Sequence, residues 1–409
     1  MPRVVLGVCG GIAAYKSVEL LRLLTEAGHS VTVVPTDNAL RFVGAPTFEA
    51  LSGNPVATDV WTGVDKVRHI EIGAQADVVV VAPATADFMA RATHGIASDL
   101  LTNTLLGTTA PVVLAPAMHT QMWQHPATAH NVALLRERGY FVIDPDSGRL
   151  TGSDSGVGRL PSPQSIFDQI EAVLAGHGDA LRGRHIAITA GGTREMWDPV
   201  RFLGNRSSGK QGVALARAAL AQGASVTLIS GSIEVDVPAG VQHVSTESAA
   251  QMLDAVRRAM KEGPDALIMA AAVADYRPIA PESTKIKKDQ QADKNPSVEL
   301  ALNEDILATV TGENPDAVII GFAAETAASH QELLSLGQKK LAAKGCSALV
   351  LNNVSNGDIF GQDHNEIVIL SPDGQLFEVS GSKISTAHAV LAHVAQLLHP
   401  VDSRVDRLN

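Results

Sequence analysis

The chain alternates short, continuous apolar runs with longer amphipathic stretches. Residues 4–8 form the first apolar run, residues 12–27 have the length and composition of a helix closed by Gly28, and residues 30–35 form a second run. Apolar runs of roughly four to eight residues bounded by glycine are typical of buried strands, whereas helices are longer. The order strand, helix, strand therefore predicts a parallel sheet with a right-handed crossover.

The second half of the chain repeats this pattern. The segment AGHSVTV at residues 27–33 is echoed by QGASVTL at residues 222–228, and each follows a strand, a glycine-rich turn and a helix. We therefore expect an α/β protein with two Rossmann-like domains in tandem, residues 1–178 and 179–409, joined by a glycine-containing linker. The other predicted strands are residues 78–82, 112–115, 185–188, 266–270, 318–322, 348–351 and 367–370, and the other predicted helices are residues 167–174, 213–222 and 383–398.

The composition of the chain limits which classes of partner and which cellular compartment we expect. A chain of 409 residues is long enough for two or three domains. Its net charge of −11 gives no general attraction for nucleic acid or an anionic membrane. Its two cysteines, Cys9 and Cys346, supply neither a disulfide framework nor a zinc motif, as is typical of a reducing compartment. No secretory signal or membrane-length apolar run is present, so a cytoplasmic location is expected.

The densest group of candidate binding residues is residues 188–212, ITAGGTREMWDPVRFLGNRSSGKQG. A predicted strand precedes it and a predicted helix follows, an order that presents backbone N–H groups and a helix N-terminus to a phosphate. Gly204, Gly209 and Lys210 have the spacing of a P-loop, but Gln211 stands where that loop needs a hydroxyl for magnesium. We therefore predict a phosphate-binding loop of another kind, with a plain glycine-rich connection as the alternative.

In the first half, two predicted strands run into unusual polar segments, residues 83–87 (PATAD) and residues 116–123 (PAMHTQMW). Ligands of open α/β sheets bind beyond the carboxyl ends of strands, so both segments are candidate site loops. The alternative for the methionines and tryptophan is core packing at helical spacing. His69, which precedes another strand, is a candidate catalytic residue, with a structural histidine as the alternative.

A stretch without periodicity, residues 274–298, separates two strands of the second half. Lys285, Lys287 and Lys288 gather there in an otherwise acidic protein. Such long connections are functional or disordered, and we interpret this one as a flap over a triphosphate, with a solvated charge run as the alternative. Lys340 and Lys344 share one face of a predicted helix, because four residues separate them.

The motifs TAGGTRE, DPVRF and NRSSGK together resemble the family of bifunctional phosphopantothenoylcysteine decarboxylases and phosphopantothenate–cysteine ligases of coenzyme A synthesis. The likeness covers nearly the whole chain in the order of that family. It implies an FMN-dependent decarboxylase in residues 1–178 and a CTP-dependent ligase in residues 179–409. It also implies that the ligase joins cysteine to 4′-phosphopantothenate through an acyl-cytidylate, and that the product is decarboxylated to 4′-phosphopantetheine.

For the second domain, the resemblance implies that Asn205 is catalytic and contacts the acyl intermediate, and that Arg206 binds substrate. Magnesium would bridge the CTP phosphates, although its protein ligands remain unknown. The residues that the resemblance assigns to CTP binding are Met269, Ala270, Ala271, Asp275, Lys285, Glu304, Asp305, Ile306, Leu307, Phe322, Lys340 and Lys344.

For the first domain, the resemblance implies that His69 assists proton removal and that Asp87, His119 and Met122 bind substrate. This sequence departs from the family at three positions: Asp87 and His119 replace asparagines, and Gly152 occupies the place of a proton-donating cysteine. We therefore expect Ser153, Asp154, His119 or water to donate that proton. The expected FMN-binding residues are Gly10, Gly11, Ile12, Thr36, Pro83, Thr85, Ser98, Pro116 and Met118.

The resemblance also implies a homo-oligomer, because the flavin site of this family is built between protomers. Trimers of the first domain joined through dimers of the second would form a dodecamer. Two alternatives stay open: a ligase whose first domain has decayed but still binds flavin, and a flavin-binding scaffold without catalysis. The departures at Asp87, His119 and Gly152 motivate the first alternative, and the retained His69 and Asn205 argue against both.

Overall fold

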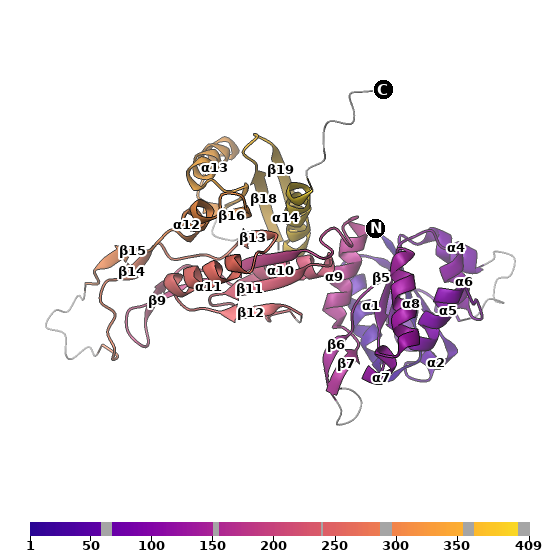
Figure 1. The fold of residues 1–409 in the computed structure, drawn as a ribbon. Helices are drawn as coiled ribbons and strands as arrows, with labels where there is room; N and C mark the ends of the chain where they lie inside the picture. Colours follow the sequence, from indigo (N-terminus) through magenta and orange to yellow (C-terminus); the bar gives the residue numbers. More distant parts are fainter. Residues whose placement is uncertain (59–67, 150–154, 239, 287–296, 355–363, 400–409) are drawn as a thin grey trace, which may run out of the picture. The chain divides into compact units, whose positions relative to one another are not determined.

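The computed structural model describes residues 1–58, 68–149, 155–238, 240–286, 297–354 and 364–399. The chain divides into two compact units, Met1–Asp179 and Ala180–Asn409 (Figure 1). Each unit contains a mainly parallel sheet with helices packed on both faces, so the predicted α/β class with two Rossmann-like units is confirmed.

The first unit is organised around a five-stranded parallel sheet in the order β2-β1-β3-β4-β5. Its strands are β1 (Arg3–Val8), β2 (Ser30–Pro35), β3 (Val78–Ala84), β4 (Val112–Pro116) and β5 (Phe141–Val142). A separate antiparallel hairpin is formed by β6 (Asp146–Arg149) and β7 (Ser155–Arg159). The helices are η1 (Ile12–Tyr15), α1 (Lys16–Glu26), α2 (Asp37–Leu40), α3 (Ala45–Ser52), α4 (Arg68–Gln75), α5 (Ala86–His94), α6 (Leu100–Gly107), α7 (Thr120–Trp123), α8 (Pro126–Glu137) and α9 (Pro163–Leu174).

Two hydrophobic clusters hold this sheet between its helices. Leu20 and Leu24 of α1 lie in one cluster with Ile170 of α9, whereas Phe88 of α5 and Leu135 of α8 lie in the other. The strand residues divide between these clusters by alternation, as the period of two requires. Because both faces are covered, the sheet offers ligands its strand ends rather than its faces.

The second unit has an eight-stranded sheet in the order β12-β11-β8-β13-β16-β17-β18-β19. The pairings are parallel from β12 to β17, and β18 and β19 add an antiparallel edge. Its strands are β8 (His185–Ala190), β11 (Ser225–Ser230), β12 (Gln242–Ser245), β13 (Ala266–Met269), β16 (Val318–Glu325), β17 (Ala348–Asn353), β18 (His364–Leu370) and β19 (Leu376–Ser382). The helices are α10 (Lys210–Ala221), α11 (Ala249–Lys261), α12 (Ile306–Glu313), α13 (His330–Lys344) and α14 (Lys383–Leu398).

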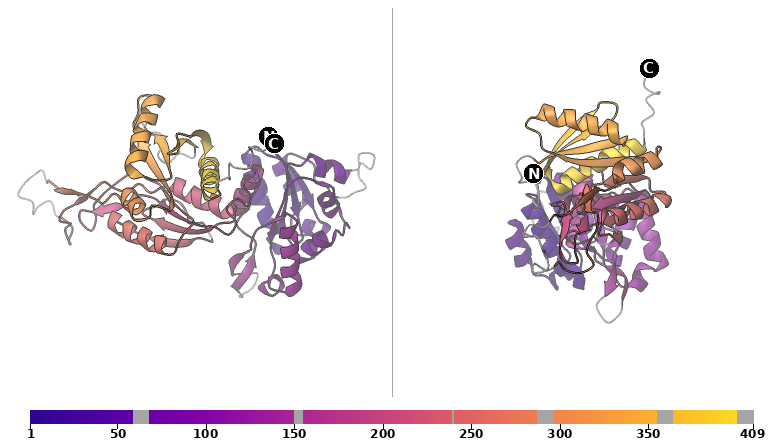
Figure 2. Two further views of the ribbon diagram at one scale, coloured as in Figure 1. Left: turned by 45° about the horizontal axis from the view of Figure 1, so that its top comes forward. Right: turned by 90° about the vertical axis from the view of Figure 1, so that its left-hand side faces the viewer.

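The helices of this unit cover both faces of its sheet, as the two views of Figure 2 show. Residues of α10 and α14 share one hydrophobic cluster, and residues of α11, α12 and α13 share another. Leu215 of α10 and Leu391 of α14 are fully buried in the first cluster. The carboxyl ends of β13, β16 and β17 therefore open between two groups of helices.

The structure differs from the sequence prediction in several local respects. The edge strands β12 and β19 were not predicted, and α9 and α10 begin four and three residues earlier than expected. The predicted helix of residues 12–27 begins with a 3₁₀ turn, η1, and becomes α-helical only at α1. The loop before α10 contains a short antiparallel hairpin of β9 (Arg194–Met196) and β10 (Phe202–Gly204), and a second hairpin pairs β14 (Tyr276–Pro278) with β15 (Leu300–Leu302). Three-residue, partly exposed strands carry too little hydrophobic alternation to be found from sequence.

Candidate functional site

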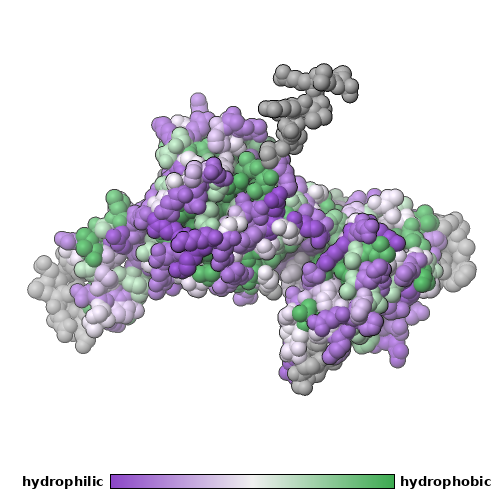
Figure 3. Space-filling view, viewed as in Figure 1, coloured by the Kyte–Doolittle hydropathy of each residue, from purple (hydrophilic) through white to green (hydrophobic). Residues whose placement is uncertain are grey.

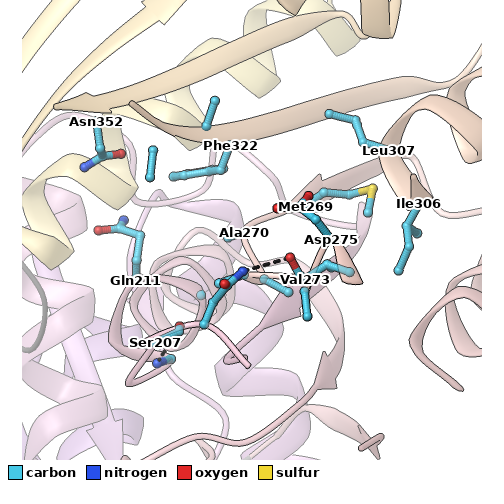
Figure 4. A pocket seen from close by; sticks show the side chains of 18 of the residues that line it. Ser207, Gln211, Met269, Ala270, Val273, Asp275, Ile306, Leu307, Phe322 and Asn352 are labelled. Carbon is cyan, nitrogen blue, oxygen red and sulfur yellow. Dashed lines mark hydrogen bonds between the residues drawn. The ribbon is translucent and has the colours of Figure 1, made fainter. Parts of the chain in front are cut away.

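A cavity of about 710 Å³ opens at the carboxyl ends of β13 and β16 in the second unit (Figure 4). It extends from the N-terminus of α10 to the facing helices α12 and α13. The sequence-predicted residues that line it are Asn205, Arg206, Met269, Ala270, Ala271, Asp275, Glu304, Asp305, Ile306, Leu307, Phe322, Lys340 and Lys344. Segments more than a hundred residues apart are thus brought together, as expected for loops at one edge of a parallel sheet.

Backbone contacts at Gly191 and Gly192 fix the position of Asn205. The amides of Gly192 and Ala272 donate to the carbonyls of Ser232 and Gly191, at 3.0 and 2.8 Å, which ties three loops together. Gly191 has a φ of 77°, and a Cβ there would lie 2.4 Å from the carbonyl oxygen of Ser232, so only glycine fits. Asn205 then donates from Nδ2 to the carbonyl of Val273 at 2.8 Å, across the cavity wall (Figure 4).

The N-terminus of α10 forms the second wall. Gly209 caps this helix with a φ of 76°, and Lys210 is its first residue. The Ser207 hydroxyl accepts a bond from the Gly209 amide at 3.4 Å, and both serines of the NRSSGK motif line the cavity. The first N–H groups of an α-helix have no carbonyl partner within the helix, and the helix dipole gives this end a partial positive charge. The N-terminus of this twelve-residue helix therefore favours an anionic group.

Lys340 and Lys344 of α13 form the third wall of the cavity, and each of them is ion-paired with a carboxylate. Lys344 of α13 pairs with Asp305, which also caps α12 by accepting from the Ala308 amide at 3.1 Å. Lys340 pairs with Glu325 at 2.5 Å. A polyphosphate entering this side would exchange these carboxylates for its own oxygens as partners of the lysines.

Lys285 does not line the cavity. Its neighbour Ile286 donates to the buried Asp198 at 3.3 Å, and Asp198 also accepts from the amides of Val200 and Arg201 at 2.8 and 2.7 Å. Burial opposes ionisation of Asp198, but these amides and the Arg201 guanidinium outweigh it and lower the pKa of the carboxyl. Lys287 and Lys288 lie outside the described residues, so the flap itself stays a prediction.

In the first unit, most of the expected flavin residues lie at one edge of the sheet. Gly10, Gly11 and Ile12 follow β1, Thr36 follows β2, Pro83 and Thr85 end β3, and Pro116 and Met118 end β4. Ser98 precedes α6. Thr36 and Thr85 cap α2 and α5, accepting from Ala39 and Phe88 at 3.3 and 3.2 Å. Gly10 packs closely, because a Cβ there would lie 2.3 Å from that of Asn38.

Two of the expected catalytic residues of the first unit, His69 and His119, lie on described elements. His69 is half-buried on α4, and its Nδ1 is buried without a hydrogen-bond partner among the described residues. His119 caps α7, which follows β4. Asp154, together with Gly152 and Ser153, lies outside the described residues.

The hairpin of β6 and β7 packs against the loop that follows β4. The amide of Met118 donates to the carbonyl of Gly158 at 2.9 Å, and a Cβ on Gly158 would lie 2.2 Å from the Met118 carbonyl oxygen. Met118 and Trp123 also pack on the core, so the packing interpretation holds for them, whereas Met122 remains 48% exposed. The expected substrate loop and the hairpin of β6 and β7 are therefore neighbours.

Sequence reasoning missed an arginine beside Asp87. Arg91 donates from Nη2 to Asp87, and from Nη1 to Ser98 at 2.8 Å and to Asp99 at 2.9 Å. The four-residue spacing of Asp87 and Arg91 on α5 was the available signal. The resemblance expects an asparagine amide at the position of Asp87. Arg91, which lies on the same helix, pairs with the Asp87 carboxylate and neutralises its charge. Sequence reasoning also missed Asn352, Asn365 and Lys383, which line the cavity of the second unit.

Cys9 and Cys346 are both buried, which argues against either as a substitute for the cysteine that the resemblance expects at Gly152. Cys9 is 2% exposed, and burial raises the pKa of its thiol to about 12. Burial also raises the pKa of Cys346. Among the described ranges, no cluster of acidic, histidine or cysteine side chains could hold a metal ion, and no helix is long and apolar enough to span a bilayer.

Both units of the chain match known protein families. Residues 181–398 match the DNA/pantothenate metabolism flavoprotein C-terminal domain, and residues 1–175 match the flavoprotein family. The chain is 52% identical to the coenzyme A biosynthesis bifunctional protein CoaBC of Mycolicibacterium smegmatis, covering 98% of this chain and 99% of that protein. It is 41% identical to the CoaBC protein of Bacillus subtilis, covering 96% and 97%. A crystal structure of a CoaBC C-terminal domain, 35% identical, covers 54% of this chain and 98% of that chain with a TM-score of 0.45. This chain belongs to the family of coenzyme A biosynthesis bifunctional proteins.

Proposed function

We propose that the second unit condenses 4′-phosphopantothenate with cysteine using CTP, and that the first unit decarboxylates the product to 4′-phosphopantetheine. The observation that carries the proposal is the convergence of Asn205, Asp275 and the lysines of α13 on one cavity. A carboxylate, a nucleoside triphosphate and an amine must meet in such a site. The cavity supplies a helix N-terminus and cations for the phosphates, and an amide beside them.

The ligase chemistry requires positioning and charge neutralisation more than covalent catalysis. The substrate carboxylate attacks the α-phosphorus of CTP and pyrophosphate leaves, giving an acyl-cytidylate. The cysteine amine then attacks the acyl carbon, CMP leaves, and the amine loses a proton. Asn205, fixed through Val273, would hold the acyl group in line for both attacks. Lys340 and Lys344 would neutralise the leaving pyrophosphate.

Magnesium fits this site only together with the phosphates. Asp275 brings a carboxylate to the cavity, whereas the carboxylates of Glu304 and Asp305 are paired with Arg257 and Lys344. Mg²⁺ keeps several waters and binds through one or two carboxylates plus substrate phosphates, which agrees with a single available carboxylate. We therefore propose Asp275 as the protein ligand of a CTP-bound magnesium ion.

The edge of the first sheet fits a flavin, which we propose to be FMN. A Cβ on Gly11 would meet no atom within 4 Å, so the edge is open there, and the neighbouring Ile12 is 60% exposed and offers an apolar contact. Thr36 and Thr85 add hydroxyls. A flavin bound there would reversibly accept electrons from the cysteine portion of the substrate, which makes loss of CO₂ feasible. His69, whose Nδ1 has no hydrogen-bond partner in the described part of the chain, would remove a proton, and His119 or Asp154 would return one.

The proposal also includes self-association and a cytoplasmic location. Large apolar side chains are exposed on β10 and on β14 and β15, and hydrophobic surface is visible over the latter pair in Figure 3. They include Phe202 (49% exposed), Tyr276 (49%) and Leu302 (69%). Such a patch is typical of an interface between copies of a chain. Sedimentation velocity would test the proposed homo-oligomer, and cell fractionation would test the location.

One incubation tests the central proposal. The purified protein, FMN, 4′-phosphopantothenate, cysteine, CTP and Mg²⁺ are mixed, and the products are read by mass spectrometry. We expect a product lighter than the cysteine amide by one CO₂. Accumulation of the amide alone would support the alternative of a decayed first unit. Untouched CTP and no amide would overturn the ligase proposal.

A further inference from the structure

Three side-chain amides form a hydrogen-bonded chain in one wall of the ligase cavity. Asn365 of β18 donates from Nδ2 to Oε1 of Gln211 at 3.0 Å, and its Oδ1 accepts from Nδ2 of Asn352 at 2.5 Å. Leu351 of β17 pairs with Val368 of β18. This register makes Asn352 and Asn365 diagonal neighbours on one face of an antiparallel pair, where side chains contact each other.

A backbone N–H fixes the direction of this chain. The amide of Glu366 donates to Oδ1 of Asn365 at 3.1 Å, and in an asparagine side chain only the oxygen can accept such a bond. Asn365 is 4% exposed, so turning its amide over would bury an unsatisfied donor against that N–H. Because the Asn365 oxygen is fixed, the atom of Asn352 that faces it must be the nitrogen.

The oxygen of Asn352 is consequently directed into the cavity. Asn352 lines the cavity, and Figure 4 shows its side-chain oxygen turned toward Phe322. A carbonyl oxygen accepts hydrogen bonds and cannot donate them. The wall therefore favours a ligand group with an N–H and disfavours a group that presents another oxygen lone pair.

We propose that Asn352 determines substrate specificity in the ligase by accepting a hydrogen bond from an N–H donor of a bound substrate, with Asn365 as the residue that positions it. This inference rests on the proposed ligase function. Two substrate groups carry that donor: the 4-amino group of cytosine and the amide N–H of the pantothenoyl arm. UTP differs from CTP by an acceptor oxygen at the first position, and an ester analogue of phosphopantothenate lacks the N–H at the second.

The experiment measures ligase kinetics of the intact wild type and of Asn352→Ala with four substrate pairs, in which CTP or UTP is combined with phosphopantothenate or its ester analogue. Losing one neutral hydrogen bond corresponds to about a two- to tenfold change in kcat/KM. If the donor is the cytosine amine, the preference for CTP over UTP falls by that factor in the variant. If the donor is the pantothenoyl amide, the preference for phosphopantothenate over the ester falls instead. Either result supports the proposal and identifies the group.

A second pair of variants shows whether a changed preference comes from the lost hydrogen bond or from impaired folding. Asn365→Leu removes the bond that orients Asn352, whereas Asn365→Asp keeps an oxygen for both Asn352 and the Glu366 amide. We expect the leucine variant to lose the affected preference and the aspartate variant to retain more of it, at matched thermal stability. An active wild type whose two preferences are unchanged by Asn352→Ala overturns the inference alone. A wild type that forms no cytidylate and no amide overturns the proposed function, and this inference with it.

Discussion

Replacing Gly209 by alanine probes the cap of α10. Gly209 has a φ of 76°, in the left-handed region, which costs an alanine about 1 kcal/mol. An added Cβ would also lie 2.4 Å from Cγ2 and 2.9 Å from Cβ of Ile233. Ile233 is β-branched and stiff, so this contact is overpacking worth about 1–3 kcal/mol. The sum is a destabilisation of about 2–4 kcal/mol.

The assay is hydrogen exchange of the α10 amides in the intact chain, read by mass spectrometry. The expected loss of protection is roughly 30-fold to 1000-fold, because each 1.4 kcal/mol is about tenfold. Gly263→Ala is the matched control: its φ is 70° and a Cβ there meets nothing within 4 Å, so only the backbone cost applies. Trimming Ile233 to alanine in the Gly209→Ala background should recover part of the loss. Equal protection in the Gly209 and Gly263 variants would refute the steric reasoning.

Four further predictions follow from the two sites. Asn205→Asp should release pyrophosphate but form little amide, because a charged side chain replaces the donor to Val273; pyrophosphate release and amide mass measure the two steps, and normal amide yield would remove Asn205 from the mechanism. Arg91→Gln should raise the KM for decarboxylation several-fold by leaving the Asp87 charge uncompensated, and adding Asp87→Asn should restore it; failure of that rescue would show that Arg91 acts only through Asp99. Gly158→Ala should slow decarboxylation while sparing amide formation, since its Cβ would meet the Met118 carbonyl, and a mass ratio of the two products reads this directly. Because burial raises the pKa of Cys9 from 9.0 to about 12, the unfolded chain ionises first, so stability should fall as pH rises from 9.0 toward 12 and a Cys9→Ala variant should lose less over that range.

The sheets were predictable from sequence because their strands are buried on both faces. Runs such as residues 78–82 and 318–322 are apolar without interruption, which is typical of a parallel strand covered on both faces. The helix of residues 383–398 was predicted with both ends correct, and the cap by Ser382 accounts for its start. Boundaries set by local chemistry are visible in a single sequence.

The features that could not be predicted from the sequence depend on contacts between distant segments. The pairing of Asn352 with Asn365 requires the register of two antiparallel strands, which sequence spacing does not specify. The short strands β9 and β10 are held by their neighbours rather than by their own hydrophobic pattern. The likeness to a known family pointed to 13 of the 31 residues that line the cavity, and nothing in the sequence showed that Lys285 would lie outside the cavity of its own chain.

The main-chain hydrogen bonds at Gly191 and Gly192 tie three loops together, and this tie determines which substitutions the region tolerates. Its bonds join main-chain atoms only, with the carbonyl of Ser232 and the amide of Ala272 as partners. Substitutions at Ser232 and Ala272 therefore leave every bond of the tie in place, whereas a side chain at Gly191 has no space. A saturation scan of this region would find freely exchangeable positions directly beside an intolerant glycine. The geometry of the site can thus persist in relatives whose side chains here have nothing in common.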